Sequence, residues 1–125
     1  MDRIKILVLD NDKFSELLEH DLVYQGIPHV IHNEIKDDFY DVCVYSPNPN
    51  HISQIQKLEH NRSLVFNGIK MTNPVLKKLV KMRIEGFIDD HEDTSSTLKA
   101  VTDIYQQKTI HERIAQKIDK LHALA

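Results

Sequence analysis

The sequence predicts an α/β protein with a five-stranded, parallel, doubly wound sheet. Three observations lead to this fold class. Short runs rich in β-branched residues alternate with stretches whose apolar residues recur every three or four positions. The first run, "IKILVL", is apolar almost throughout, as expected of a strand covered on both faces. Each run is followed by a helical pattern or its remnant, an order that gives parallel strands joined by right-handed crossovers.

The first half of the chain contains three of the expected strands. They are placed at residues 4–9, 29–32 and 41–46. Helical spacing over residues 14–22 predicts the first helix, which the Gly-Ile-Pro segment that follows brings to an end. Only residues 33–40 separate the second strand from the third, so any second helix must be very short.

The second half continues the alternation. Strands are expected at residues 63–67 and 86–88, and helices at residues 52–58, 75–80 and 98–105. Asn73 and Pro74 suit the N-cap and first position of a helix. Asp93 and the hydroxyl residues after it supply caps for the next helix.

A further amphipathic helix is expected at the C-terminus. Thr109 and Glu112 form a capping-box pattern, which predicts a break near residues 106–108. Four apolar residues then keep one face of the helix: Ile110, Ile114, Ile118 and Leu121. We therefore divide the chain into residues 1–108 and 109–125. The second part would fold back on its own domain, meet its twin in a homodimer, or lead to a further domain.

Composition bounds the function. The 125 residues suit one domain, and a net charge of −3 gives no footprint for direct nucleic-acid binding. Apolar runs of four or five residues fall far below the roughly 18 needed to cross a membrane. No export signal is recognisable, so the cytoplasm is the expected compartment. Cys43 lies inside an expected strand and is predicted to pack as a small apolar residue.

Polar residues follow several of the expected strands. In a doubly wound sheet the working site lies at the carboxyl ends of the strands, so these side chains are expected to converge. They are Asp10, Asn11, Asp12, Ser46, Asn67, Asp89 and Asp90.

Over roughly residues 3–107 the chain resembles a response-regulator receiver domain, the flavodoxin-like module of two-component signal transduction and phosphorelays. The resemblance rests on "IKILVLDND", on "YDVCVY" with its leading aspartate, and on "EGFIDD" followed by "TSSTLKAVTDIYQQKTI". The last stretch is similar to the end of receivers that precede a LuxR-type DNA-binding domain, which implies a role in transcription regulation.

The resemblance implies a set of functional positions. In the family an acidic pair after the first strand holds Mg²⁺, and an aspartate after the third strand accepts a phosphoryl group. A Ser or Thr after the fourth strand senses that group, and a lysine after the fifth pairs with it. These roles fall here on Asp10 and Asn11, on Ser46, on Asn67 and on Asp90. Only Asp10 keeps its residue type.

Each departure weakens the implied chemistry. The hydroxyl of Ser46 needs an activating base, and its phosphoester would lack the ready hydrolysis of an acyl phosphate. Asp90 places an anion where the family has a cation. Phe87 matches the aromatic that swings inward when the sensor hydroxyl moves, and without that hydroxyl we expect a fixed core or interface residue. The sequence thus predicts a pseudo-receiver.

We expect a non-phosphorylatable domain that acts through a protein partner or self-association, without catalysis, cofactor or membrane contact. The predicted interface consists of Ile110, Ile114, Ile118 and Leu121. The alternative keeps a switch, in which a ligand binds the altered pocket or a divalent cation binds weakly at Asp10 and Asp12. An enzyme is a third class. It is disfavoured because Ser46 lacks the flanking glycines of a nucleophile elbow.

Overall fold

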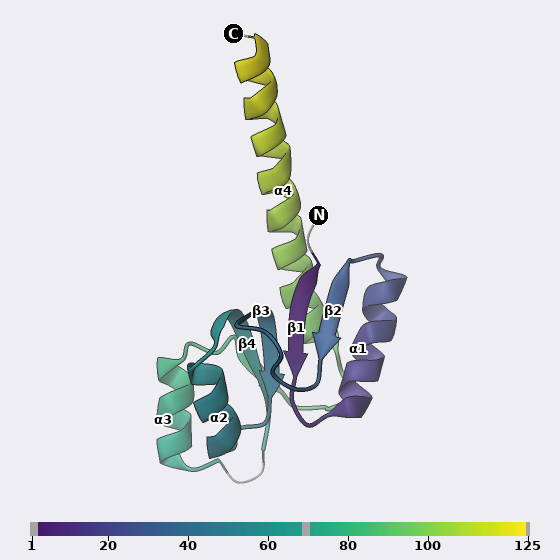
Figure 1. The fold of residues 1–125 in the computed structure, drawn as a ribbon. Coiled ribbons are helices and arrows are strands. Elements are labelled where there is room, and N and C mark those ends of the chain that lie inside the picture. Colours follow the sequence, from purple (N-terminus) through teal and green to yellow (C-terminus); the bar gives the residue numbers. More distant parts are fainter. Residues whose placement is uncertain (1–2, 69–70, 125) are drawn as a thin grey trace.

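A computed structural model describes residues 3–68 and 71–124. Its five strands form one parallel sheet in the order β2-β1-β3-β4-β5, the doubly wound order of flavodoxin-like folds (Figure 1). The strands are β1 (Ile4–Val8), β2 (His29–His32), β3 (Phe39–Tyr45), β4 (Glu59–Phe66) and β5 (Gly86–Ile88). The predicted fold class is confirmed.

Helices cover both faces of the sheet. They are α1 (Asp12–Tyr24), α2 (Pro49–Gln56), α3 (Asn73–Lys81) and α4 (Ser95–Leu124). The helices α1 and α4 pack on one face, where Phe14 and Phe66 meet edge to face at 5.1 Å between ring centroids. The helices α2 and α3 pack on the other face, against β-strand residues that include the fully buried Cys43. Cys43 is thus the small core residue that the sequence predicts.

The connection from β2 to β3 contains no helix among the described residues, so the expected short helix is reduced to a loop. The hydroxyl of Tyr40 organises this loop. It accepts hydrogen bonds from the backbone amides of Lys36 and Asp37 at 3.0 and 3.2 Å, and it lies 2.8 Å from His32 Nδ1. One buried side chain thereby satisfies loop amides that a helix would have bonded internally.

The break expected near residues 106–108 is wrong, because α4 runs without interruption from Ser95 to Leu124. The hydroxyl of Thr109, predicted to cap a new helix, instead bonds the carbonyl of Tyr105 at 2.9 Å, within the same helix. No glycine or proline lies between residues 95 and 124 to end the helix. The first part of α4 packs on the sheet, and residues 110–123 are exposed. Figure 1 shows this second part projecting beyond the amino ends of the strands.

Several element starts also differ from expectation; β3, for example, begins at Phe39 and not at residue 41. Thr72, rather than Asn73, is the residue before α3, and its side chain makes no capping bond. The strand β4 begins four residues early, at Glu59, because its first residues pair with Phe39 and Tyr40 of β3. Its early residues are polar and partly exposed, so the apolar pattern did not show them.

In the part of the chain that the structure describes, no helix has the length and apolar character needed to span a membrane.

Candidate functional site

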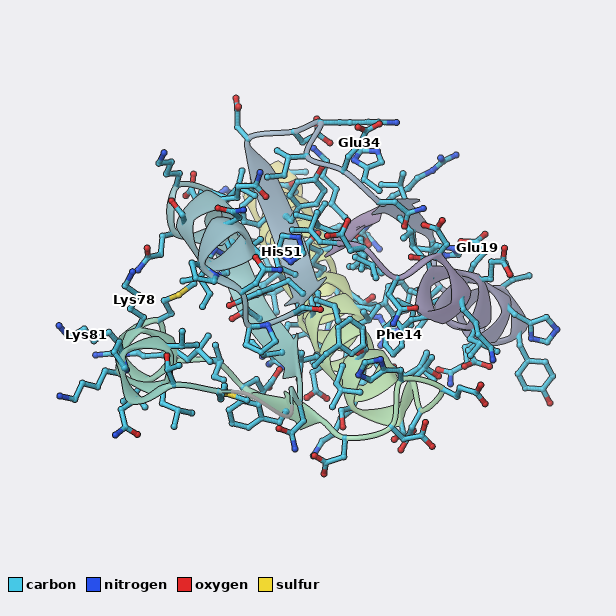
Figure 2. All side chains as sticks on the ribbon, turned by 90° about the horizontal axis from the view of Figure 1, so that it is seen from below. Phe14, Glu19, Glu34, His51, Lys78 and Lys81 are labelled. Carbon is cyan, nitrogen blue, oxygen red and sulfur yellow. The ribbon has the colours of Figure 1, made fainter. Side chains whose placement is uncertain are left out.

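The carboxyl ends of β1, β3, β4 and β5 meet along one edge of the sheet, as the sequence predicts. The pairing of Val8 with Val44 sets the residues after β1 beside those after β3, and the pairing of Phe66 with Ile88 does the same for β4 and β5. Figure 2 looks onto this edge, with His51 near the centre between α1 and α3. This carboxyl edge is the candidate site.

Asp10 is held by an internal partner. Its backbone has φ 55°, a left-handed conformation that aspartate adopts more readily than most residues. Its carboxylate oxygen Oδ2 lies 2.6 Å from Nε2 of His51, a buried residue of α2. The Asp10 side chain is 73% exposed and the His51 side chain is 11% exposed. The Asp10 carboxylate therefore lies on the solvent side of the buried His51 ring.

Hydrogen bonds set the tautomer of His51. Asn48 caps α2, and its Oδ1 accepts the backbone amide of His51 at 2.8 Å. The Nδ2 amide of Asn48 therefore faces His51 Nδ1, at 3.0 Å, and donates to it. With Nδ1 acting as the acceptor, the ring proton lies on Nε2 and is donated to Asp10. Hydrogen bonds thus run from Asn48 to His51 and from His51 to Asp10, and this chain of three residues links the loop after β3 to the loop after β1.

Sequence reasoning missed His51. The strand ends drew attention to Ser46, whereas the residue that contacts Asp10 lies five positions later, inside the next helix. The sequence did contain a signal for His51. Asn48 and Pro49 suit the N-cap and first position of a helix, and the side chain of an N-cap lies beside the third residue after it, which here is His51. A cleft of about 500 Å³ opens next to the pair, lined in part by Asn33, Glu34 and His51.

Asn11 caps the helix α1. It is the N-cap, and its side-chain oxygen accepts the amide of Phe14 at 3.0 Å. Asp12 lies in the first turn of the same helix, where a negative charge is favourable. Within residues 3–68 and 71–124, no group of three or more His, Cys, Asp or Glu side chains is arranged to hold a metal ion. The weak cation site at Asp10 and Asp12 stays a prediction.

Ser46 is half-buried where β3 ends. Its backbone carbonyl accepts the amide of Asn48 at 2.8 Å, a bond that tightens the turn into α2. Among the described hydrogen bonds and ion pairs, none joins the Ser46 side chain to Asp10, Asn67 or Asp90. The residue therefore acts in the turn, next to the polar chain of Asp10 and His51 rather than within it.

Asn67 and Asp89 form the second contact of the carboxyl edge. The Asn67 amide Nδ2 donates to Asp89 Oδ1 at 2.8 Å, and the Asn67 backbone amide bonds the carbonyl of Ile88 at 2.8 Å. The predicted sensor thus contacts the residue directly after β5. Asp90, the next residue, stabilises the turn that follows: its Oδ1 accepts a hydrogen bond from the backbone amide of Glu92 at 2.9 Å.

A cation approaches this turn from α1. Lys13 forms an ion pair with Glu92, and the hydrogen bond and charge of Glu92 raise the pKa of Lys13.

Phe87 of β5 is 42% exposed, which rules out the core placement and leaves its role as an interface residue a prediction. The four predicted interface residues of α4 lie along its projecting part, and their exposed fractions range from 46% to 66%.

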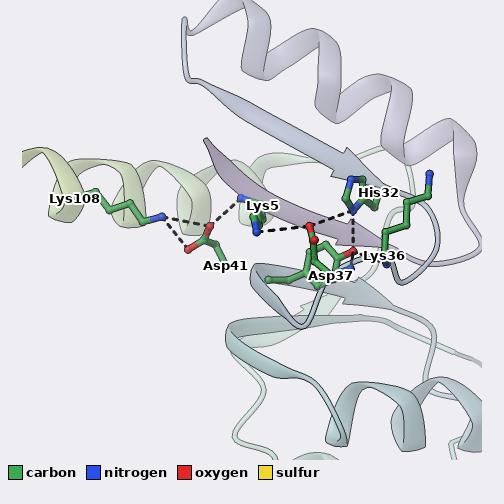
Figure 3. A network of polar contacts seen from close by, with 7 residues as sticks. Lys5, His32, Lys36, Asp37, Asp41 and Lys108 are labelled. Carbon is green, nitrogen blue, oxygen red and sulfur yellow. Dashed lines mark hydrogen bonds and ion pairs between the residues drawn. The ribbon is translucent and has the colours of Figure 1, made fainter. Parts of the chain in front are cut away.

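A separate polar network anchors α4 near the amino edge of the sheet (Figure 3). The carboxylate of Asp41 is 3% exposed, and it accepts the backbone amide of Lys5 at 2.8 Å. Lys108 Nζ lies 3.2 Å from the other oxygen of Asp41. Lys5 Nζ lies 3.6 Å from Asp37, which in turn lies 3.9 Å from His32. The leading aspartate of "YDVCVY" therefore fixes α4 just before the helix leaves the domain.

Comparison with known proteins adds one finding. No protein-family model matches the sequence, and no curated protein matches it. Among solved structures, the fold is similar to that of an adenylate cyclase from Rhodopirellula baltica, with a TM-score of 0.58 and 14% identity over 93% of this chain and 99% of that one. The likeness shows the fold. At this identity it shows nothing of the chemistry.

Proposed function

We propose that this chain is a non-phosphorylatable receiver-like domain that acts through protein contacts in signal transduction or transcriptional control. The contact between Asp10 and His51 carries the proposal. A receiver needs the acid after β1 as a ligand for Mg²⁺, a metal that takes hard oxygen ligands. Here that carboxylate accepts a hydrogen bond from the His51 imidazole, and the neighbouring Asn11 is engaged as a helix cap.

The other strand ends agree with this proposal. The position of the phosphoryl acceptor holds Ser46, and no described hydrogen bond links its hydroxyl to a base. The position of the phosphate-binding lysine holds Asp90. Two like charges about 4 Å apart repel by roughly 4 kcal/mol at an effective dielectric near 20, so an anion there opposes a bound phosphoryl group. Asn67, in place of the sensor hydroxyl, is bonded to Asp89.

Fixed contacts take the place of the switch. In the proposed domain the chain of Asn48, His51 and Asp10 holds the loops after β1 and β3 together without a ligand. The pair of Asn67 and Asp89 does the same for the loops after β4 and β5. The domain then presents one conformation to its partner, in place of the two that a phosphorylation switch requires.

A second candidate function is favoured by the cleft beside Asp10. It is lined by polar side chains that include Asn33, Glu34 and Gln54, and a small polar ligand or a cation bound there would contact Asp10 directly. Such a ligand would compete with His51 for the carboxylate. It would thereby convert the fixed contact into a switch.

Catalysis is not part of the proposal, although the similar solved structure is named an adenylate cyclase. With three glycines in the chain, the sequence offers no glycine-rich phosphate loop. Incubation of the protein with ATP and Mg²⁺ tests this point. We expect no cyclic AMP, and its steady production in proportion to protein concentration would contradict a purely binding role.

The proposal is tested by thermal unfolding with Mg²⁺ alone and with Mg²⁺ plus beryllofluoride, a mimic of a bound phosphoryl group. We expect the same melting temperature in all samples, because neither the metal nor the mimic finds its ligands. A rise with Mg²⁺ alone that is lost in Asp10→Asn would favour the cation-switched alternative. A rise only with the mimic would show a working phosphoryl pocket and would end the proposal.

A further inference from the structure

The projecting part of α4, residues 110–123, carries apolar side chains that its own domain does not cover. Ile110, Ile114, Ile118 and Leu121 are 54%, 50%, 46% and 66% exposed. Figure 1 shows this segment extending away from the sheet and the other helices. Isolated helices of this length are marginal in water, so an uncovered apolar face here indicates a surface that packs against something.

The four side chains form one narrow stripe. They follow each other at steps of four, four and three residues, which at 3.6 residues per turn places all of them within about 80° of the helix circumference. The interval of eleven residues from Ile110 to Leu121 spans three turns, which is close to the natural period of the helix. A second straight helix would therefore stay in contact with the whole stripe.

The two flanks of the stripe differ in charge. One flank carries Arg113, Lys117 and Lys120, spaced by four and three residues; we call it the basic row. The other flank carries His111, Ala115 and His122, which we call the histidine row. The acidic residues Glu112 and Asp119 lie on the back of the helix, away from the stripe.

This asymmetry distinguishes the two ways in which copies of the helix can pair. In an antiparallel pair each flank faces the same flank of the second copy, so the basic rows would meet and repel. In a parallel pair each basic row faces the histidine row of the second copy, in the manner of facing positions in parallel coiled coils. The like charges are then separated.

We propose that the projecting part of α4 pairs with the same segment of a second copy, parallel and in register. Ile110 lies opposite Ile110 of the second copy, and Leu121 lies opposite its counterpart. Both domains then sit at the same end of the helix pair. This pairing rests on the protein contacts of the proposed function and names their partner, a second copy of the chain. It does not depend on the state of the carboxyl edge.

Single cysteines placed on the stripe test both the pairing and its direction. Ile110→Cys and Leu121→Cys are each incubated alone and as a mixture under mild oxidation, with the full chain. Cys43 does not interfere, since it is fully buried. The matched control is Glu112→Cys, on the back of the same helix. Sedimentation of the unmodified chain over a hundredfold range of concentration measures the association itself.

The expected result is a disulfide-linked dimer from each stripe variant alone, with at least tenfold less from Glu112→Cys, and a reversible dimer of the unmodified chain. Cross-linking only in the mixture of Ile110→Cys and Leu121→Cys would show an antiparallel pair and overturn the parallel arrangement. A chain that stays monomeric and forms no cross-link in any sample would overturn the pairing. Neither failure changes the melting behaviour with Mg²⁺ and beryllofluoride, which tests the proposed function separately.

Discussion

The Asp10 carboxylate and the His51 imidazole lie 2.6 Å apart at the carboxyl edge of the sheet, where a receiver would hold its metal. The histidine comes from α2, and Asn48 fixes its orientation through two hydrogen bonds. A side-chain donor of the protein itself thus contacts the carboxylate oxygen that a cation would need.

Replacing His51 tests how much this contact contributes to folding. His51→Ala removes a buried ring, and it leaves Asn48 and Asp10 without their partner. We expect the free energy of unfolding in urea to fall by about 1–2 kcal/mol, most of it from the buried ring, because the exposed carboxylate of Asp10 contributes little. His20→Ala, at an exposed position of α1, is the control and should change stability by less than about 0.5 kcal/mol. Equal values for the two variants would show that the chain through His51 is not formed.

The contact between Asp41 and Lys108 gives a second prediction. Lys108→Met keeps most of the aliphatic stem but removes the cation from a carboxylate that is 3% exposed. We expect a loss of about 1–3 kcal/mol, below the usual cost of breaking a buried pair because the Lys108 side chain is 35% exposed. Lys99→Met, at an exposed position earlier in α4, is the matched control. If both variants unfold at the same urea concentration, Asp41 does not anchor the helix.

Phe66 and Phe87 test the placement of the aromatic residues. Phe66 is buried against Phe14, whereas Phe87 is 42% exposed on the edge strand. Phe66→Leu should cost about 1–2 kcal/mol, through lost volume and the lost edge-to-face contact. Phe87→Leu should cost less than about 0.5 kcal/mol. A larger effect of Phe87→Leu than of Phe66→Leu on urea unfolding would mean that Phe87 packs inward.

Alkaline unfolding gives a prediction from the buried thiol. Burial raises the pKa of Cys43 from 9.0 to about 12. Below pH 9 the thiol is protonated in both states and its contribution to stability is complete. Between pH 9 and 12 the unfolded thiol loses its proton while the folded thiol keeps it, so stability falls by up to about 1.4 kcal/mol per pH unit.

The variant Cys43→Ala removes that slope and serves as the comparison. Burial also raises the pKa of Tyr45, so part of the alkaline loss should persist in the variant at the upper end of the range. The free energy of unfolding is measured in urea at steps of half a pH unit from pH 8 to 11. Parallel curves for the two proteins would show that Cys43 is not buried as described.

Local patterns in the sequence predicted the sheet and most helices, because the apolar runs of the strands depend on burial alone. The uninterrupted α4 shows where such patterns fail. The capping-box pattern at Thr109 and Glu112 is also compatible with the interior of a helix, where the threonine hydroxyl bonds the preceding turn. Only the absence of glycine and proline indicated that the helix continues.

At the candidate site the sequence predicted the edge but not its pairing. The order of strands places Asp10, Ser46, Asn67 and Asp89 along one edge, and the structure shows that arrangement. Which side chains touch depends on loop conformations, such as the left-handed backbone of Asp10 and the turn of Asn48. Those conformations turn Asp10 toward α2 and His51, a residue that the strand pattern does not include.

Intact mass after incubation with Mg²⁺ and acetyl phosphate reports whether the carboxyl edge accepts a phosphoryl group. We expect an unchanged mass, because Asp10 is bonded to His51, no described hydrogen bond joins the Ser46 hydroxyl to a base, and a negative charge at Asp90 would repel the incoming anion. A stoichiometric gain of one phosphoryl group, mapped to Ser46 or to an aspartate of this edge, would contradict it.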